Sequence, residues 1–199
     1  MNSLTPRQLI LASTSVYRRQ MLERLRLPFT VIASAVDESA LPDETPQQLA
    51  LRLALAKAKA VADHHPDSVV IGSDQVADLN GQALGKPGTH ARAVQQLQRM
   101  RGQTVVFQTA VAVVCVNSAF AQTELAQVQV TFRALTDQQI EAYLQAEQPY
   151  DCAGSAKSEG LGIALLERIH NDDPTALVGL PLIHTCSLLQ AAGIAVLVL

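Results

Sequence analysis

The sequence predicts a mixed α/β fold, in which a curved sheet is flanked by helices. Segments with helical periodicity alternate with short apolar segments that are typical of buried strands. The Asn80-Gly81 pair is a hairpin signal, so antiparallel strands are expected as well. The chain has 199 residues, of which 48% are hydrophobic and 17% are charged. We therefore expect a single domain over residues 1–199, which could divide into two lobes around a central cleft.

The composition excludes several classes of protein. A net charge of −3 provides no basic field for a nucleic-acid polymer, although a small anionic ligand needs only a few local cations. The cysteines Cys115, Cys152 and Cys186 match no metal-ligand spacing, which favours free thiols in a reducing compartment. No signal peptide is recognisable, and the apolar segment 193–199 is too short to cross a membrane. We therefore expect a cytoplasmic protein without a membrane segment.

Apolar runs and capping residues predict the first elements. Residues 9–12 form an apolar strand, and Ser13-Thr14-Ser15 then opens a helix that Pro28 ends. Residues 29–33 have the pattern of a second strand, and a polar loop follows at 37–44.

The next helix has the clearest start signal in the chain. Thr45-Pro46-Gln47-Gln48 is a capping-box pattern with proline at the first helical position, and this helix is expected to run to about Ala62. The apolar run at 69–77 then predicts a buried strand. The later expected elements are a helix from Thr89 or His90 to about Met100, strands at 105–116 and 123–133, a helix at 136–146, a loop at 149–162, a strand at 163–169, a helix at 181–192 and a terminal strand at 193–199.

Arg18 is the first candidate site residue. If Ser15 is the N-cap of its helix, Arg18 takes the third helical position, where a capping box would place Glu or Gln. A cation in the first turn opposes the helix dipole, at a cost of roughly a few tenths of a kcal/mol. A strand, two hydroxyls, a helix N-terminus and an arginine suit an anion, but a solvated arginine on an ordinary helix explains this stretch equally well.

Two lysines are further candidates. Lys57 shares a helix face with the apolar Leu49 and Leu53, so its ammonium either reaches the rim, which is commoner, or points into a polar pocket. Lys86 ends the stretch GQALGK at residues 81–86, which lacks the spacing and the hydroxyl residue of a Walker phosphate loop. Lys86 could still reach a phosphate as a point charge.

Two acids are candidates for a metal or for catalysis. Asp74 follows an apolar strand, so its local sequence predicts burial, and a buried carboxylate needs a partner. Glu38 lies in a polar loop, where a solvated acid is the commoner case. Together they could supply the one or two carboxylates that Mg²⁺ uses beside waters and phosphate oxygens. The five histidines form no ligand pattern, and we assign none of them to catalysis.

Seven stretches together resemble the Maf family of nucleoside triphosphate pyrophosphatases. They occur in family order and cover nearly the whole chain: LASTSVYRRQML (11–22), VDES (36–39), LRLALAKAKA (51–60), IGSDQV (71–76), LGKP (84–87), CAGSAKSEGLG (152–162) and LVGLPL (177–182). The resemblance implies a fold related to the Ham1 (ITPase-like) enzymes and a homodimer. It also implies hydrolysis of a nucleoside triphosphate to the monophosphate and pyrophosphate, with a divalent metal, Mg²⁺ or Mn²⁺.

The resemblance also implies roles for single residues. Asp74 falls on the position described as the proton acceptor. Our own hypothesis is that Asp74 and Glu38 together hold the metal. Other polar site positions of the family are held here by Ser15, Arg18, Glu38, Lys57 and Lys86, and we add Ser13, before the same helix as Ser15, as a substrate-binding candidate.

Three further positions separate the branches of this family. The branch that acts on dTTP and UTP carries Arg, Thr and Gln where this chain has Tyr17, Gln75 and Glu159. These residues resemble the branch that hydrolyses 7-methyl-GTP, although its aromatic residue is often Trp. N7-methylguanine is positively charged, and an aromatic face attracts a cation by about 0.5–2 kcal/mol. Glu159 can accept hydrogen bonds from the guanine N1–H and N2–H₂ groups, and Gln75 can supply an amide contact.

Two other functions remain as hypotheses. One is hydrolysis of a different modified or canonical nucleotide, such as dTTP or UTP. The other is a non-catalytic nucleotide-binding regulator of cell division.

Asp74 and Gln75 are adjacent, which sets a geometric condition. Strict alternation along a strand puts Gly72 and Asp74 on one face, and Ser73 and Gln75 on the other. If Asp74 and Gln75 both face one nucleotide, the strand is expected to twist or bulge near Gly72.

Overall fold

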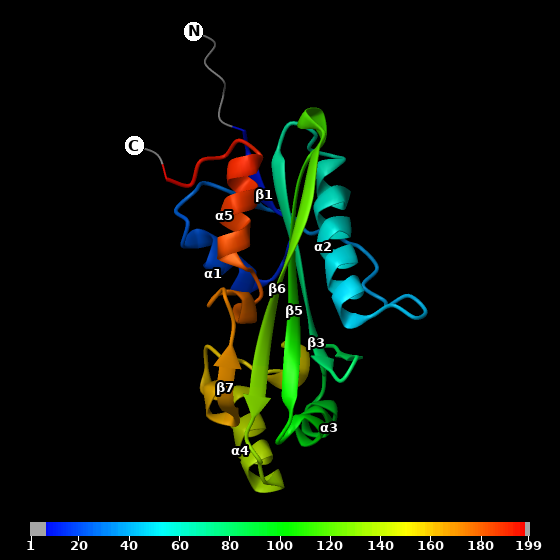
Figure 1. Cartoon of the computed structure of the whole chain (residues 1–199), viewed down its shortest axis with the longest axis vertical. Coiled ribbons are helices and arrows are strands. Elements are labelled where there is room, and N and C mark those ends of the chain that lie inside the picture. The colour runs from blue at the N-terminus through cyan, green and yellow to red at the C-terminus, as the bar shows by residue number, and fades with distance from the viewer. Residues whose placement is uncertain (1–6, 198–199) are drawn as a thin grey trace.

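The computed structural model describes residues 7–197, which form a mixed seven-stranded sheet with helices on both faces (Figure 1). The predicted fold class is confirmed. The strands are β1 (Leu9–Leu11), β2 (Thr30–Val31), β3 (Val69–Leu79), β4 (Gln82–Leu84), β5 (Thr104–Cys115), β6 (Phe120–Phe132) and β7 (Leu166–His170). The α-helices are α1 (Val16–Glu23), α2 (Pro46–Ala62), α3 (His90–Met100), α4 (Asp137–Glu147) and α5 (Leu182–Ala191). None of the described helices combines the length and the apolar character needed to cross a membrane.

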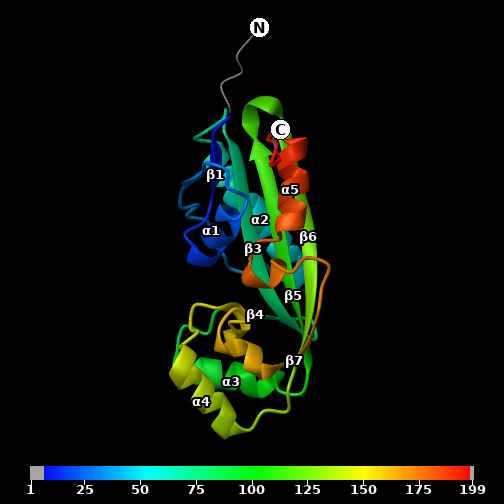
Figure 2. The same ribbon diagram turned by 90° about the vertical axis from the view of Figure 1, so that its left-hand side faces the viewer.

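The sheet has the strand order β2-β1-β3-β5-β6-β7, and β4 pairs with β3 beside this path. Strand β1 is parallel to both β2 and β3, whereas the pairs β3–β4, β3–β5, β5–β6 and β6–β7 are antiparallel. The long strands β3, β5 and β6 run along the molecule, with α1, α2 and α5 around one half and α3 and α4 around the other (Figure 2). The sheet is therefore the frame that connects the two halves.

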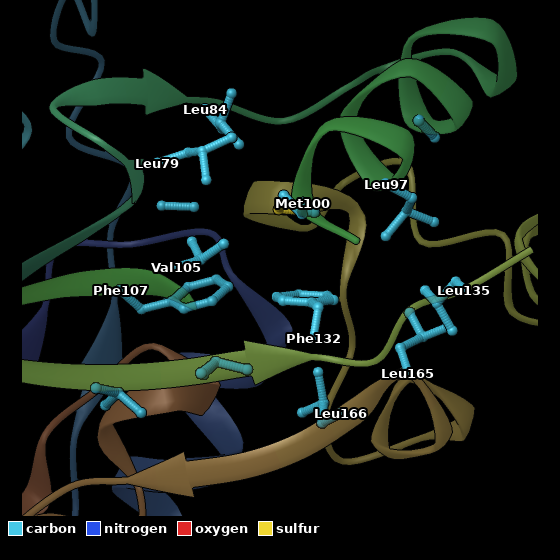
Figure 3. Close-up of a cluster of buried hydrophobic side chains, with 14 of the residues drawn as sticks. Leu79, Leu84, Leu97, Met100, Val105, Phe107, Phe132, Leu135, Leu165 and Leu166 are labelled. Atoms are coloured by element: carbon cyan, nitrogen blue, oxygen red, sulfur yellow. The ribbon is translucent and has the colours of Figure 1, made fainter. Parts of the chain in front are cut away.

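Each half has its own buried core. One core, which includes Met100, Phe107 and Phe132, lies between the sheet and helices α3 and α4 (Figure 3). The other half contains two clusters, because the sheet there is covered on both faces. One of these clusters involves α1 and α5, and the other involves α2. This arrangement leaves room for a polar cavity where the two halves meet.

The capping residues act as the sequence predicts. The Ser15 hydroxyl is the N-cap of α1 and accepts from the backbone N–H of Arg18 at 3.4 Å, which confirms that Arg18 is the third helical residue. Thr45 and Gln48 form the predicted capping box at the start of α2.

Gly72 allows helix α2 to lie directly against strand β3. A Cβ at this position would overlap the backbone oxygen of Ala54 and would lie only 2.5 Å from the backbone nitrogen of Ala58. The predicted bulge near Gly72 is wrong, because the β3–β5 register runs without a shift from Val70 to Asp78. The glycine thus serves close helix packing, not a break in the strand.

Three predicted strands differ in extent. The strand expected at 163–169 starts only at Leu166, because residues Leu161–Leu165 form a 3₁₀ helix before pairing with β6 begins. The second strand is limited to the two residues of β2. Residues 193–197 form no strand. The backbone N–H of Ile194 donates to Leu189, so this segment folds back onto the end of α5. Residues 198–199 of the expected terminal strand lie outside the described residues.

Candidate active site

A cavity of about 800 Å³ lies where the two halves of the molecule meet. Its wall comes from the start of α1, the loop before α2, helix α2, strand β3, the turn after β4, and the segments 151–159 and 177–179. All of the predicted site residues lie on this wall: Ser13, Ser15, Tyr17, Arg18, Glu38, Lys57, Asp74, Gln75, Lys86 and Glu159. Residues that are up to 146 positions apart in the sequence therefore meet in one place.

An open strand edge explains how Asp74 and Gln75 reach the same cavity. Pairing of β3 with β1 ends at Ile71, and pairing with β4 begins at Ala77. Between these points β3 has only β5 beside it, so the cavity extends around the free edge onto both faces of the sheet. Asp74 and Gln75 thus project from opposite faces into one cavity, and no bulge is needed.

Lys57 forms the centre of a charged cluster. Its ammonium lies 2.6 Å from an oxygen of Asp74 and 2.6 Å from an oxygen of Glu38. The side chains of Lys57 and Asp74 are only 6% and 9% exposed, whereas that of Glu38 is 54% exposed. Burial would raise the pKa of Glu38, but the hydrogen bond and charge of Lys57, with the charges of Lys86 and Arg18, outweigh this and lower it. Of the two orientations open to Lys57, the structure has the one in which it points into a polar pocket.

Arg18 is held by a backbone carbonyl from the far end of the chain. Its Nε donates to the oxygen of Gly179 at 2.9 Å, and the Ser73 hydroxyl donates to the same oxygen at 3.0 Å. Gly179 has a φ of +116°, a conformation that favours glycine. Burial lowers the pKa of Arg18, although the nearby Asp74 and Glu38 charges oppose this shift. With Nε occupied, the two terminal nitrogens remain available for an anion.

Gln75 is fixed by its amide nitrogen. Nε2 lies 2.9 Å from the Thr109 hydroxyl and 3.0 Å from the carbonyl oxygens of both Ala176 and Leu177. These acceptors orient the side chain on the cavity wall, and they leave its Oε1 atom as the group that can accept from a ligand.

Tyr17 lies in an acidic surrounding. Burial is the main cause that raises its pKa, and Cys152, Asp151 and Glu159 raise it further. The Cys152 thiol lies 4.0 Å from the tyrosine hydroxyl, and burial with the charge of Asp151 raises the pKa of this thiol to about 12. The Lys157 ammonium lies 5.8 Å from the centre of the Tyr17 ring. Tyr17 and Cys152 therefore both stay protonated at neutral pH.

The charges on the cavity wall form two groups. Arg18, Lys57 and Lys86 act on Glu38, which marks a cationic group around the Asp74–Lys57 pair. Acids dominate around Tyr17 on the same wall. The arrangement suits a ligand with two parts. One part is anionic and is bound by the cations, and the other is a planar organic group with positive charge, which the acids and the Tyr17 ring attract.

The residues of the cavity fit a divalent metal at one point. Among the described residues, no group of three or more His, Cys, Asp or Glu side chains could hold a metal. Glu38 and Asp74 nevertheless direct oxygens to the same ammonium, so the two carboxylates converge. Mg²⁺ is commonly held by one or two carboxylates together with waters and substrate phosphates, and this donor set matches that pattern.

Several functional contacts were not assigned from sequence. Gly179, Cys152 and Lys157 lie inside motifs that the resemblance uses, but the motifs alone give them no role. The contact between Arg18 and Gly179 spans 161 positions, and no local pattern signals it.

Comparisons with known proteins identify the family of the chain. Residues 8–192 match the family described as Maf-like protein, and the chain belongs to this family. It is similar to a protein of Albidiferax ferrireducens named 7-methyl-GTP pyrophosphatase, with 72% identity over 96% of both chains. A protein of the same name from Polaromonas sp. is also 72% identical, over 97% of this chain and 89% of its own length. A Burkholderia pseudomallei protein with this name is 57% identical over 96% of this chain and 91% of its own.

Among solved structures, the chain is similar to the Ham1 protein of Staphylococcus aureus, with a TM-score of 0.48 and 15% sequence identity. That similarity covers 64% of this chain and 73% of the other.

Proposed function

We propose that this protein hydrolyses 7-methyl-GTP to 7-methyl-GMP and pyrophosphate in the cavity described above. The observation that carries the proposal is the division of charge on the cavity wall, with cations around Asp74 and acids around Tyr17. A triphosphate suits the first group, and a positively charged purine suits the second. The names of relatives that are 72% and 57% identical to this chain support the same substrate.

Tyr17, Glu159 and Gln75 would recognise the base. The tyrosine face attracts the cationic ring by about 0.5–2 kcal/mol. The Glu159 carboxylate would accept from N1–H and N2–H₂ of guanine, and it would also balance the charge of the methylated ring. The free Oε1 of Gln75 offers a further acceptor.

The cationic group would bind the triphosphate. Arg18, Lys57 and Lys86 would neutralise the charge that develops on the departing pyrophosphate. Ser13 and Ser15 lie at the start of α1, where hydroxyls and backbone N–H groups favour phosphate oxygens.

Asp74 would act on the attacking water. The water oxygen forms a bond to the α-phosphorus, and Asp74 orients this water or accepts its proton. The bond between the α-phosphorus and the bridging oxygen then breaks, and pyrophosphate leaves.

The proposal includes a divalent metal, Mg²⁺ or Mn²⁺. Asp74 and Glu38 would hold it, and when bound it would shield the negative charge of the phosphate oxygens. In the structure the Lys57 ammonium neutralises these two carboxylates. When substrate and metal are present, the ammonium would contact phosphate oxygens instead. A homodimer, a cytoplasmic location and one domain with two lobes around the cavity belong to the same proposal. The family resemblance supports the homodimer, the spacing of the cysteines supports a reducing compartment, and the length of the chain supports a single domain.

A substrate panel tests this function. Purified protein is incubated with 7-methyl-GTP, GTP, CTP, UTP and dTTP, with and without Mg²⁺ or Mn²⁺, and pyrophosphate is measured. We expect the fastest release from 7-methyl-GTP with metal. Faster release from UTP or dTTP would assign the chain to another nucleotide. Binding without release in any condition would favour a non-catalytic regulator.

A further inference from the structure

Helix α4 holds the loop that carries Glu159 through two side chains, the Tyr143 hydroxyl, which accepts from the backbone N–H of Lys157 at 3.1 Å, and the Glu147 carboxylate. Glu147 is the last residue of α4, and its Oε1 lies 2.8 Å from the Lys157 ammonium. Its Oε2 accepts from the backbone N–H of Leu161 at 2.7 Å. A Cβ at residue 160 would lie 2.7 Å from this carboxylate, so Gly160 is needed for the close approach.

This position is unusual for an acid. A carboxylate at a helix C-terminus is opposed by the helix dipole, so Glu147 does not stabilise its own helix. Its side chain is only 14% exposed, and the two contacts to the loop lower its pKa, with the Lys157 hydrogen bond as the larger cause. The contacts of Glu147 are therefore made with the loop.

The loop places two groups at the base end of the cavity. Lys157 lies over the Tyr17 ring at 5.8 Å from its centre, and Glu159 lies on the cavity wall. Lys157 thus lies over one face of the ring, so a base that stacks on Tyr17 would lie on the other. A bare ammonium there would repel a cationic base through the ring, but the Glu147 carboxylate neutralises it.

We propose that Glu147 is a positioning and specificity-determining residue for the base end, which acts by neutralising Lys157 behind Tyr17 and by holding the Glu159 loop. The proposal rests on the proposed function, because it concerns discrimination between a methylated, cationic guanine and an uncharged one. The formal charges of Glu147, Glu159 and Asp151, at −1 each, and of Lys157, at +1, give the surroundings of Tyr17 a net charge of −2. Replacing Glu147 by a neutral residue would halve this charge.

The test compares Glu147→Gln with the double variant Glu147→Gln/Lys157→Met. Glutamine keeps the shape and an oxygen that can accept from Leu161, so the loop stays attached. Dissociation constants for 7-methyl-GMP and GMP are measured by calorimetry, and kcat and KM are measured for both triphosphates.

Glu147→Gln should weaken the binding of 7-methyl-GMP by about two- to fivefold, as expected for a partly exposed charge, and change the binding of GMP less. With 7-methyl-GTP as substrate, the Michaelis constant should rise while kcat stays nearly unchanged. In the double variant the unneutralised ammonium is gone, so the preference for the methylated base should return. Equal losses for both bases, or a double variant no better than the single one, would overturn the proposal. Wild-type protein that prefers the methylated base but releases no pyrophosphate would refute the proposed function alone.

Discussion

Replacing Lys57 by methionine tests the charged centre of the site. Methionine retains most of the apolar stem, so the change removes chiefly the ammonium that lies 2.6 Å from both carboxylates. Removing one partner of a buried ion pair costs about 3–5 kcal/mol. The exposed Glu38 pair adds little, at about 0–1 kcal/mol. Because the cavity gives Asp74 some access to water, we expect a loss of about 2–4 kcal/mol in the free energy of unfolding.

Urea denaturation at pH 7 measures this loss. Lys59→Met is the matched control, since Lys59 is an exposed lysine on the same helix and its replacement should cost no more than about 0.5 kcal/mol. If Lys57→Met is as stable as this control, Lys57 does not neutralise a buried carboxylate.

The same variant also tests how the carboxylates relate to a metal. Without the Lys57 ammonium, Asp74 and Glu38 lose the cation that lies in contact with both, so Mn²⁺ alone should stabilise the variant more than it stabilises the wild type. Adding Asp74→Asn should abolish this stabilisation. A wild type that gains as much from Mn²⁺ as the variant would contradict the idea that Lys57 and a metal compete for these oxygens.

Four other variants have defined outcomes. Asp74→Asn should still fold, because the Lys57 ammonium keeps its contact with Glu38, and it should lose about 100-fold or more in turnover, as measured by pyrophosphate release. Gly72→Ala should lower the free energy of unfolding by about 1–3 kcal/mol, because the added methyl group overlaps helix α2. Tyr17→Arg combined with Glu159→Gln should move the substrate preference toward UTP and dTTP. The stability difference between wild type and Glu147→Gln should be full at neutral pH and shrink as the pH falls below 4.5, because the folded pKa of Glu147 is depressed from that value.

Controls and opposite results define these tests. Gly85→Ala, where an added Cβ meets nothing within 4 Å, should leave stability nearly unchanged. Near wild-type turnover of Asp74→Asn would remove this residue from the mechanism. Unchanged base preference in the Tyr17 and Glu159 variant would mean that other residues read the base. A stability difference for Glu147→Gln that grows in acid would contradict the contacts assigned to this carboxylate.

Local patterns predicted most of the elements, but not how the site is assembled. The capping box of α2 and the apolar row that contains Lys57 depend on neighbours within one or two turns, so the sequence shows them directly. Whether Lys57 reached the rim or a pocket depended on Asp74, which is on another element. The bulge predicted near Gly72 failed for a similar reason, because alternation along β3 does not reveal where its neighbours β1 and β4 stop pairing.

The contacts that orient the site are longer in range still. Arg18 and Ser73 share the carbonyl of Gly179, and Glu147 holds the loop of Lys157. These contacts depend on tertiary packing. The resemblance marked the segments of Lys157 and Gly179, but not the end of α4 that carries Glu147.

The most direct test of the account is the ratio of kcat/KM for 7-methyl-GTP to that for GTP, in the wild type and in Tyr17→Leu. The methyl group adds one positive charge, so an aromatic ring surrounded by acids should make the wild-type ratio about ten or more. Tyr17→Leu removes the ring but keeps the phosphate-binding cations. The ratio should therefore fall toward one, the value expected when the positive charge of the base gives no advantage. Equal kcat/KM values for both nucleotides in the wild type, or a ratio unaffected by Tyr17→Leu, would contradict the account.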